Sequence, residues 1–225
     1  MGRQLTFDLP VRAAQGRSDF MVAPSNAGAL AALVGPWPQG KLVLTGPAGS
    51  GKSHLAQVWA GEQGAVALTG ADLAAAALGR IDTTAVLVDD ADRVAGDPAG
   101  EQALFHLHNL VVAAGGRLLL TGGDAPARWP IALPDLASRL AASATAALNP
   151  PDDHLLAALL VKLFADRQLR VSPVLIAYLV KRMDRSFAAA GALVAALDAR
   201  ALAERRAVTR VLAAEVLDFA RQNRP

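Results

Sequence analysis

The stretch Gly46-Pro47-Ala48-Gly49-Ser50-Gly51-Lys52-Ser53 has the pattern G-x-x-x-x-G-K-[ST], which is typical of loops that bind nucleoside triphosphates. Triphosphate oxygens need closely spaced donors, and residues without bulky side chains let the backbone wrap around them. Lys52 is expected to reach the β- and γ-phosphates, and the Ser53 hydroxyl is expected to bind Mg²⁺. The sequence therefore predicts a site for ATP or ADP with Mg²⁺ and leaves the choice of nucleotide open.

The residues on either side agree with this prediction. Residues 41–45 are an apolar run that predicts a buried strand, and residues 53–59 predict a helix. The free N–H groups and the positive dipole end of that helix would face the phosphates. A glycine-rich turn before an ordinary helix is the alternative, but strand, loop, Lys-Ser pair and helix together favour a phosphate loop.

Length and composition favour a packed globular protein. The 225 residues suffice for one medium-sized α/β domain and a small second domain, and 53% are hydrophobic against 19% charged. The chain has no cysteine, which excludes disulfides and thiolate chemistry, and its four histidines lack zinc-ligand spacing. There is no bilayer-spanning apolar run and no secretory leader, so a cytoplasmic protein without membrane contact is expected.

Charge alone does not predict nucleic-acid binding, because the formal net charge is only +2. Six arginines cluster near the C-terminus, and a solvated helical face is the expectation for them: Arg200, Arg205, Arg206, Arg210, Arg221 and Arg224.

Strands and helices alternate along residues 19–150, which predicts an α/β domain with a parallel sheet and helices on both faces. The expected strands are 41–45, 65–68, 85–89, 117–121 and 145–148, and the expected helices are 25–34, 53–59, 70–79, 100–113 and 134–142. Two prolines at positions 150 and 151 end this pattern. Residues 151–225 predict a small all-α lid domain, with helices near 152–167, 173–183, 186–204 and 208–222. Residues 1–18 are polar and irregular, and a flexible leader is expected there.

Polar residues follow two of the predicted strands. Asp89 and Asp90 end the strand 85–89, where the first carboxylate is expected to hold the Mg²⁺ shell and the second to orient or deprotonate water. Thr121 or Asp124, at the end of the strand 117–121, is expected to sense the γ-phosphate, although a simple Gly-Gly-Asp turn is the alternative. Arg139 lies on the helix that follows, where it could serve a neighbour's nucleotide or be an ordinary surface charge.

The order of these motifs resembles that of AAA+ ATPases, and within them the central module of the bacterial replication initiator DnaA. Residues 19–26 are similar to the initiator segment that cradles adenine, which assigns Phe20, Val22 and Asn26 to the base. Residues 51–55, with His54, are similar to its G-K-T-H-L, and residues 120–124 to its L-T-S-D. Residues 136–140 resemble its L-x-S-R-F, which implies that Arg139 is an arginine finger. The resemblance covers about residues 18–218.

Two initiator domains are not expected in this chain, which narrows the resemblance to the Hda family of short regulatory homologues of the initiator. Neither the initiator's N-terminal interaction domain nor its DNA-reading helix-turn-helix domain is expected in this chain. Residues 4–9, Gln-Leu-Thr-Phe-Asp-Leu, are similar to the peptide with which that family docks in the polymerase sliding clamp. Gln4, Leu5, Phe7 and Leu9 would then bind the clamp, and an edge strand packed on the domain itself is the alternative. DNA contact would be indirect, through the clamp, and self-association stays open.

The chain departs from the family at the lid arginine that touches the nucleotide phosphates. Alignment of residues 181–188 puts Ala188 where that arginine belongs, and Arg185 could substitute for it or be a surface charge. The departure puts the chain's own ATP hydrolysis in question.

Three functions are therefore compared. The resemblance implies a regulator that binds the clamp and stimulates hydrolysis of ATP on the initiator, so that initiation is repressed. A helicase-loader or transposition-type ATPase shares the G-K-[ST]-H-L-A start but leaves residues 4–9 unexplained. A small-molecule phosphoryl-transfer kinase fits less well with the double carboxylate and the separate lid. A GTPase is disfavoured because the guanine motif N-K-x-D does not occur.

Overall fold

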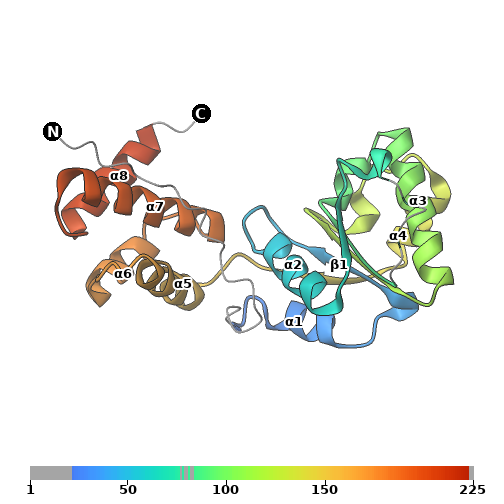
Figure 1. The fold of residues 1–225 in the computed structure, drawn as a ribbon, viewed down its shortest axis with the longest axis horizontal. Coiled ribbons are helices and arrows are strands. Elements are labelled where there is room, and N and C mark those ends of the chain that lie inside the picture. The colour runs from blue at the N-terminus through green and yellow to red at the C-terminus, as the bar shows by residue number, and fades with distance from the viewer. Residues whose placement is uncertain (1–21, 77, 79–80, 82–83, 223–225) are drawn as a thin grey trace, which may run out of the picture.

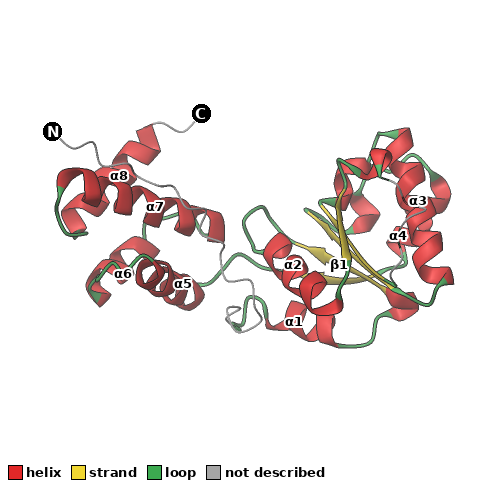
Figure 2. Ribbon diagram, in the orientation of Figure 1, coloured by secondary structure: helices red, strands yellow, loops and turns green. Residues whose placement is uncertain are grey.

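The computed structural model describes residues 22–76, 78, 81 and 84–222, and these residues form two lobes (Figure 1). The α/β lobe, residues 22–150, contains a sheet between helices. The helical lobe, residues 151–222, contains helices alone and lies to one side of the first lobe (Figure 2).

The sheet is parallel throughout, with strand order β2-β3-β4-β1-β5. Its strands are β1 (Lys41–Thr45), β2 (Val66–Thr69), β3 (Ala85–Asp89), β4 (Arg117–Gly122) and β5 (Ala144–Ala147). The central strands β1, β3 and β4 are nearly continuous runs of buried aliphatic residues, as expected for strands covered on both faces. Because β4 lies between β1 and β3, the carboxyl ends of these three strands meet at one edge.

Helices cover both faces of the sheet. On one face, α1 (Ala27–Val34) and α2 (Lys52–Gln63) pack Leu33, Leu55 and Trp59 against the strands. On the other face, α3 (Pro98–Ala113) and α4 (Pro134–Ala141) pack Leu104 and Leu136 against the strands. Short 3₁₀ turns η2 (Pro38–Gly40), η3 (Leu73–Ala75), η5 (Ala91–Val94) and η6 (Pro126–Arg128) complete the lobe.

The helical lobe has a hydrophobic core of its own. Its helices are α5 (Asp153–Asp166), α6 (Pro173–Val180), α7 (Phe187–Glu204) and α8 (Arg210–Gln222). Side chains of Asp152, Ser172 and Ser186 cap the first three by accepting backbone N–H bonds, and Pro173 starts α6. Buried Leu160, Phe164 and others from all four helices then meet in one cluster.

The predicted fold class is confirmed, and the strands agree with the expected ranges to within one or two residues. The helix expected at 70–79 is wrong for the described residues, which contain the short 3₁₀ turn η3 and no α-helix. Helix α6 also ends at Val180 instead of continuing to residue 183. None of the helices within the described ranges is long and apolar enough to cross a membrane.

Candidate functional site

The predicted phosphate loop connects β1 to the first turn of α2. Gly46 and Gly49 have φ angles of 149° and 74°, which residues with side chains rarely adopt. Any side chain on Gly46 would collide with the carbonyl oxygen of Leu148. Lys52 is buried, and its Nζ donates to the carbonyl oxygens of Gly46 (2.7 Å) and Pro47 (3.0 Å). The lysine therefore closes the loop on itself at the N-terminus of α2.

The residues of this loop fit a nucleotide phosphate. The hydroxyl of Ser50 is buried and has no hydrogen-bond partner among the described residues. The positive end of α2 begins at Gly51, and Lys52 supplies a full charge beside it. Loop residues Gly46 to Ser53 could thus hold the phosphates, and His54 follows, half-buried, in the first turn of α2.

Three predicted site residues meet at the carboxyl edge of the sheet. Ser53 Oγ donates to Asp89 Oδ1 (3.1 Å), and Thr121 Oγ1 donates to the same oxygen (2.5 Å). Thr121 is fully buried, and its hydroxyl also accepts the backbone N–H of Asp90 (2.8 Å). The carboxylate of Asp89 and the hydroxyl of Ser53 are oxygen ligands of the kind that Mg²⁺ prefers. They could hold that ion, and Thr121 fixes the carboxylate in place.

Asp90 adopts a left-handed backbone conformation with φ 48°, which is uncommon for a residue other than glycine. Its N–H bond to Thr121 helps to hold this conformation. Its carboxylate lies half-exposed, 3.4 Å from the Nε of Arg93, a residue that the sequence reasoning did not single out. The Asp90 carboxylate is therefore accessible to water.

Of the two candidates for a γ-phosphate sensor, the structure brings only Thr121 to the cluster. The Asp124 carboxylate is exposed and lies 3.5 Å from the Nη1 of Arg128. Sequence reasoning also missed Asp92, whose Oδ2 accepts the N–H of Gly123 (2.7 Å) and so fixes the turn after β4.

The predicted adenine-contacting residues lie before α1. Asn26 is buried, and its Oδ1 accepts the N–H of Ala23 (2.8 Å), so it closes a turn instead of capping the helix. That turn is tied to the chain beside the phosphate loop, because Asn149 N donates to Ser25 O (3.2 Å). Val22 is exposed, and Phe20 lies outside the described residues.

The start of α7 rests on the phosphate loop. Phe187 N donates to the carbonyl oxygen of Gly49 (3.0 Å), and a Cβ on Gly49 would lie 2.5 Å from Ser186. Ala188, at the position expected for the lid arginine, has no charge to offer the phosphate loop. Arg185 binds other groups. The Arg185 guanidinium pairs with Asp153 and donates to the carbonyl oxygen of Pro151 (3.3 Å), so it braces the connection between the lobes.

Arg139 lies near the amino-terminal ends of the strands, whereas the phosphate loop follows the carboxyl end of β1. Its carbonyl oxygen accepts the Nζ of Lys41 (3.1 Å), and Lys41 begins β1 whereas the loop follows its end. The Arg139 side chain is exposed, with its guanidinium carbon 5.1 Å from the ring centroid of Phe105 on α3. The chain's own phosphate loop is therefore not the group that Arg139 serves.

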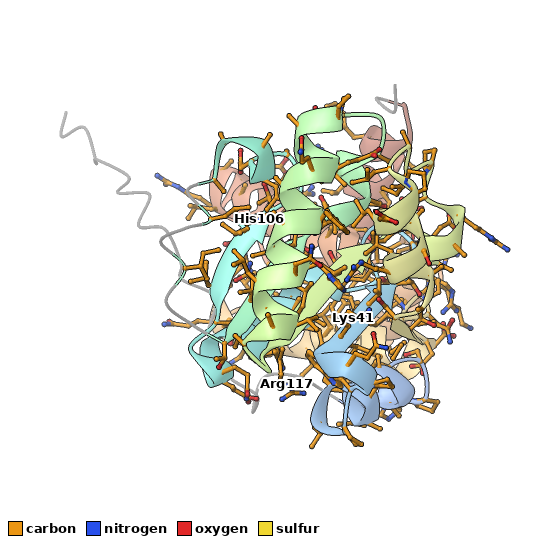
Figure 3. All side chains as sticks on the ribbon, turned by 90° about the vertical axis from the view of Figure 1, so that its right-hand side faces the viewer. Lys41, His106 and Arg117 are labelled. Carbon is orange, nitrogen blue, oxygen red and sulfur yellow. The ribbon has the colours of Figure 1, made fainter. Side chains whose placement is uncertain are left out.

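The sequence reasoning missed three buried polar residues near α4, and two of them, Lys41 and Glu101, bind backbone groups in or just before this helix. Lys41 is almost fully buried within the α/β lobe (Figure 3), and burial, followed by the Arg139 charge, lowers the pKa of its ammonium. His108 is equally buried, and burial lowers its pKa as well. Glu101 accepts the N–H groups of Gly96, Ala132 and Leu133 at 2.8–3.0 Å. Burial raises the Glu101 pKa, but these bonds outweigh it and hold the pKa below its ordinary value.

The predicted clamp-binding residues Gln4, Leu5, Phe7 and Leu9 lie outside the described residues.

No protein-family model matches the chain. Among solved structures, it is similar to domain III of the Thermotoga maritima replication initiation protein DnaA, with 18% identity, a TM-score of 0.80, and coverage of 94% of this chain and 98% of that one. It is similar to AMPPCP-bound DnaA from Aquifex aeolicus, with 16% identity, a TM-score of 0.67, and coverage of 79% and 63%. It is also similar to the Thermotoga maritima RuvB branch-migration motor, with 17% identity, a TM-score of 0.63, and coverage of 87% and 66%.

The chain thus spans nearly all of an isolated DnaA domain III but less than two thirds of the longer initiator. Similarity at this level of identity concerns the fold, and the site residues are judged on their geometry. The similarity to DnaA domain III covers both lobes of the chain, the α/β lobe with its parallel sheet and the helical lobe. The chain therefore has the AAA+ fold of the DnaA-type replication initiators.

Proposed function

We propose that the chain is a nucleotide-binding AAA+ regulator of DNA replication, which docks on the polymerase sliding clamp and delivers Arg139 to ATP bound by the replication initiator. Hydrolysis on the initiator would then end its active state and repress initiation. The observation that carries this proposal is the position of Arg139, exposed on α4 at the far edge of the sheet from the chain's own phosphate loop. At this position Arg139 can contact only a nucleotide that is bound to a second protein molecule.

The geometry of α4 supports a finger role. Two groups hold the Arg139 carbonyl oxygen, Lys41 Nζ and Ser143 Oγ, each at 3.1 Å, while the guanidinium stays exposed over Phe105. The backbone is thus fixed and the charge is presented outwards. A planar guanidinium donates to two phosphate oxygens at once, which suits charge that develops on a transferring phosphoryl group.

The chain's own nucleotide would have a different purpose. Loop residues 46–53 would bind it, and Ser53 and Asp89 would hold Mg²⁺. The AMPPCP-bound initiator from Aquifex aeolicus supports nucleotide binding by this fold. Ala188 supplies no charge at the position expected for the lid arginine, and Arg185 is paired with Asp153. Slow intrinsic hydrolysis is therefore proposed, with bound nucleotide stabilising the contact between the loop and α7.

The clamp part of the proposal depends on residues 4–9. A glutamine followed by Leu5, Phe7 and Leu9 offers apolar anchors for one greasy pocket, and a few such anchors carry most of a peptide's affinity. A clamp on DNA would concentrate the chain near the initiator. Self-association is compatible with the same exposed arginine, which could also face a second copy.

Single-turnover hydrolysis of labelled ATP on the purified initiator, with DNA-loaded clamp, tests the finger. Arg139→Ala should reduce the stimulated rate by about 10³-fold or more, the lower range for fingers supplied in trans. Arg139→Lys should fail as well, because an ammonium cannot make the bidentate contact. Arg128→Ala, which removes an exposed arginine from the same lobe, is the control and should retain stimulation. Full stimulation by Arg139→Ala would reject the proposal.

Clamp capture is tested separately. Gln4→Ala, and the double change of Leu5 and Phe7 to Ala, should abolish capture by immobilised clamp without a change in melting temperature. Thr6→Ala lies in the same segment, between the proposed anchors, and should retain capture. Capture by the double variant, or a fall in its melting temperature, would show that the peptide has a structural role instead.

A further inference from the structure

Two arginines of the helical lobe meet on one aromatic ring. Tyr178, half-buried on α6, has the guanidinium carbon of Arg182 4.1 Å from its ring centroid and that of Arg210 4.8 Å away. Arg182 lies just beyond the end of α6, and Arg210 is the first residue of α8, which packs against α6. Both arginines are exposed. Distant parts of the sequence thus bring two positive charges to the same surface point.

Neither arginine pairs with a carboxylate within the part of the chain that the structure describes. Other arginines of the lobe do so: Arg167 with Asp198, Arg185 with Asp153, and Arg200 and Arg206 with both Glu204 and Glu215. Lys181, next to Arg182, is also exposed and adds a third positive charge to the neighbourhood. Carboxylates thus neutralise four of the lobe's arginines, whereas Arg182 and Arg210 have no such partner among the described residues.

The arrangement is electrostatically unfavourable for the protein alone. Both charges lie within 5 Å of one ring centroid, so their separation is below the screening length of about 10 Å at 0.1 M salt. Arg210 also stands at the N-terminus of α8, where the helix dipole disfavours a cation. Contacts with the ring offset part of this cost, at about 0.5–1 kcal/mol each for exposed pairs. An external anion would offset the rest.

We propose that Arg182 and Arg210, steadied by Tyr178, bind the phosphodiester backbone of nucleic acid. Guanidinium groups match phosphate oxygens with paired hydrogen bonds, and two adjacent groups can follow successive phosphates of one strand. Contacts of this kind recognise charge and not base sequence. This surface lies on α6 and α8, apart from the phosphate loop, and the proposal does not rest on the function proposed above.

A nucleic-acid backbone is favoured over an anionic membrane by the packing of α8. Leu212, Ala213, Val216 and Leu217 form the apolar face of this helix, and all four are buried in the core of the helical lobe. A helix that lies in a membrane interface must insert such a face between the lipids. In α8 these side chains already pack in the core of the lobe and cannot insert into lipid.

Binding is measured by fluorescence anisotropy of a labelled 20-base-pair duplex at 50 and 200 mM salt, with the full chain. The double variant Arg182→Ala/Arg210→Ala should bind at least about fivefold more weakly at 50 mM salt. Each lost phosphate contact removes about 0.9 from the slope of log K against log salt, or about 3.5-fold over this range. The ratio of the two dissociation constants should therefore shrink by about tenfold in the double variant.

The matched control is Arg200→Ala/Arg206→Ala, which removes two arginines from the same lobe that are already paired with carboxylates. It should keep the wild-type salt dependence, and both variants should melt near the wild-type temperature. If both double variants lose duplex affinity equally, the loss reflects net charge alone, and the proposal is overturned. It also fails if the wild type does not bind the duplex at 50 mM salt. A third refuting result is a double variant that loses only capture by vesicles with 30% phosphatidylserine and still binds DNA normally.

Discussion

Replacing Glu101 with alanine tests how the structure supports the helix that carries Arg139. Glu101 lies in the first turns of α3 and is 2% exposed. Its carboxylate accepts N–H groups from Gly96, Ala132 and Leu133, and the last two lead directly into α4. The Glu101→Ala variant therefore leaves three backbone donors without their partner and releases the start of α4.

The cost follows from those three donors. An unsatisfied buried donor costs about 1–3 kcal/mol. A cavity of about 460 Å³ adjoins Glu101, Ala132 and Leu133, so water can reach the freed N–H groups and the lower end of that range applies. The expected loss is therefore about 3 kcal/mol in the free energy of unfolding. At about 2–4 °C per kcal/mol for a chain of this length, the melting temperature should fall by about 6–12 °C.

The carboxylate also makes the prediction dependent on pH. Hydrogen bonds from the backbone hold the Glu101 pKa in the folded protein below its ordinary value of 4.5. A lowered folded pKa means that the stabilisation is fully present above the unfolded pKa and is lost as pH falls through the folded pKa. Glu101→Gln, which keeps the shape without the charge, should therefore be less stable than the wild type at pH 7, with the difference shrinking below pH 4.5.

Urea denaturation followed by circular dichroism between pH 3 and pH 7 measures both effects. Gln102→Ala, an exposed change on the next residue of the same helix, is the control and should stay within about 0.5 kcal/mol of the wild type. A melting temperature within 2 °C of the wild type for Glu101→Ala would refute the reasoning. A Glu101→Gln difference that is constant with pH would show that the charge is not what stabilises the α4 start.

Three further substitutions test the candidate site. Lys52→Ala should weaken nucleotide binding by at least tenfold, about 1.4 kcal/mol, in isothermal titration calorimetry, because it removes the lysine cation of the phosphate loop. Thr121→Val should cost about 2 kcal/mol of unfolding free energy in urea titrations, since the Asp90 N–H loses its buried acceptor while the side-chain shape is kept. Lys41→Met should leave calorimetric nucleotide affinity unchanged and lower the single-turnover rate on the initiator, because the Arg139 carbonyl oxygen loses its Lys41 donor. Unchanged affinity, unchanged stability and an unchanged rate, respectively, would contradict these three expectations.

The sequence predicts the α/β lobe well because its signals are local. Each central strand is a short, nearly continuous aliphatic run bounded by turn residues, which is typical of a strand buried in a parallel sheet. The alanine-rich stretch at 71–77 misled the helix prediction, because alanine favours helices by propensity. The structure instead uses Leu73 to fill the core under α3 and ends the turn two residues later. Tertiary packing decided against local propensity there.

In the candidate site, too, the residues with local sequence signals were predicted, and those that depend on long-range contacts were missed. Ser53 and Asp89 lie 36 residues apart, yet their meeting follows from motif spacing and the rule that parallel strand ends share one edge. Glu101, Asp92 and Lys41 escaped prediction because a single polar residue on an amphipathic helix or at a strand end is usually solvated. Only the folded chain shows that each one satisfies backbone groups of a distant segment. The pairing of Arg185 with Asp153 was hidden for the same reason.

The parallel sheet also separates the phosphate loop from Arg139, the residue proposed to act on a partner's nucleotide. All strands point the same way, so the loops after their carboxyl ends collect the phosphate loop, Asp89 and Thr121 at one edge. Helix α4 returns the chain to the opposite edge before β5, and there Lys41, the first residue of β1, holds the carbonyl of Arg139. One strand therefore carries the nucleotide loop at its end and steadies the arginine at its start. Any tilt of β1 on nucleotide binding would therefore be felt at Arg139, and this contact would couple the two sites if Arg139 acts on a partner as proposed.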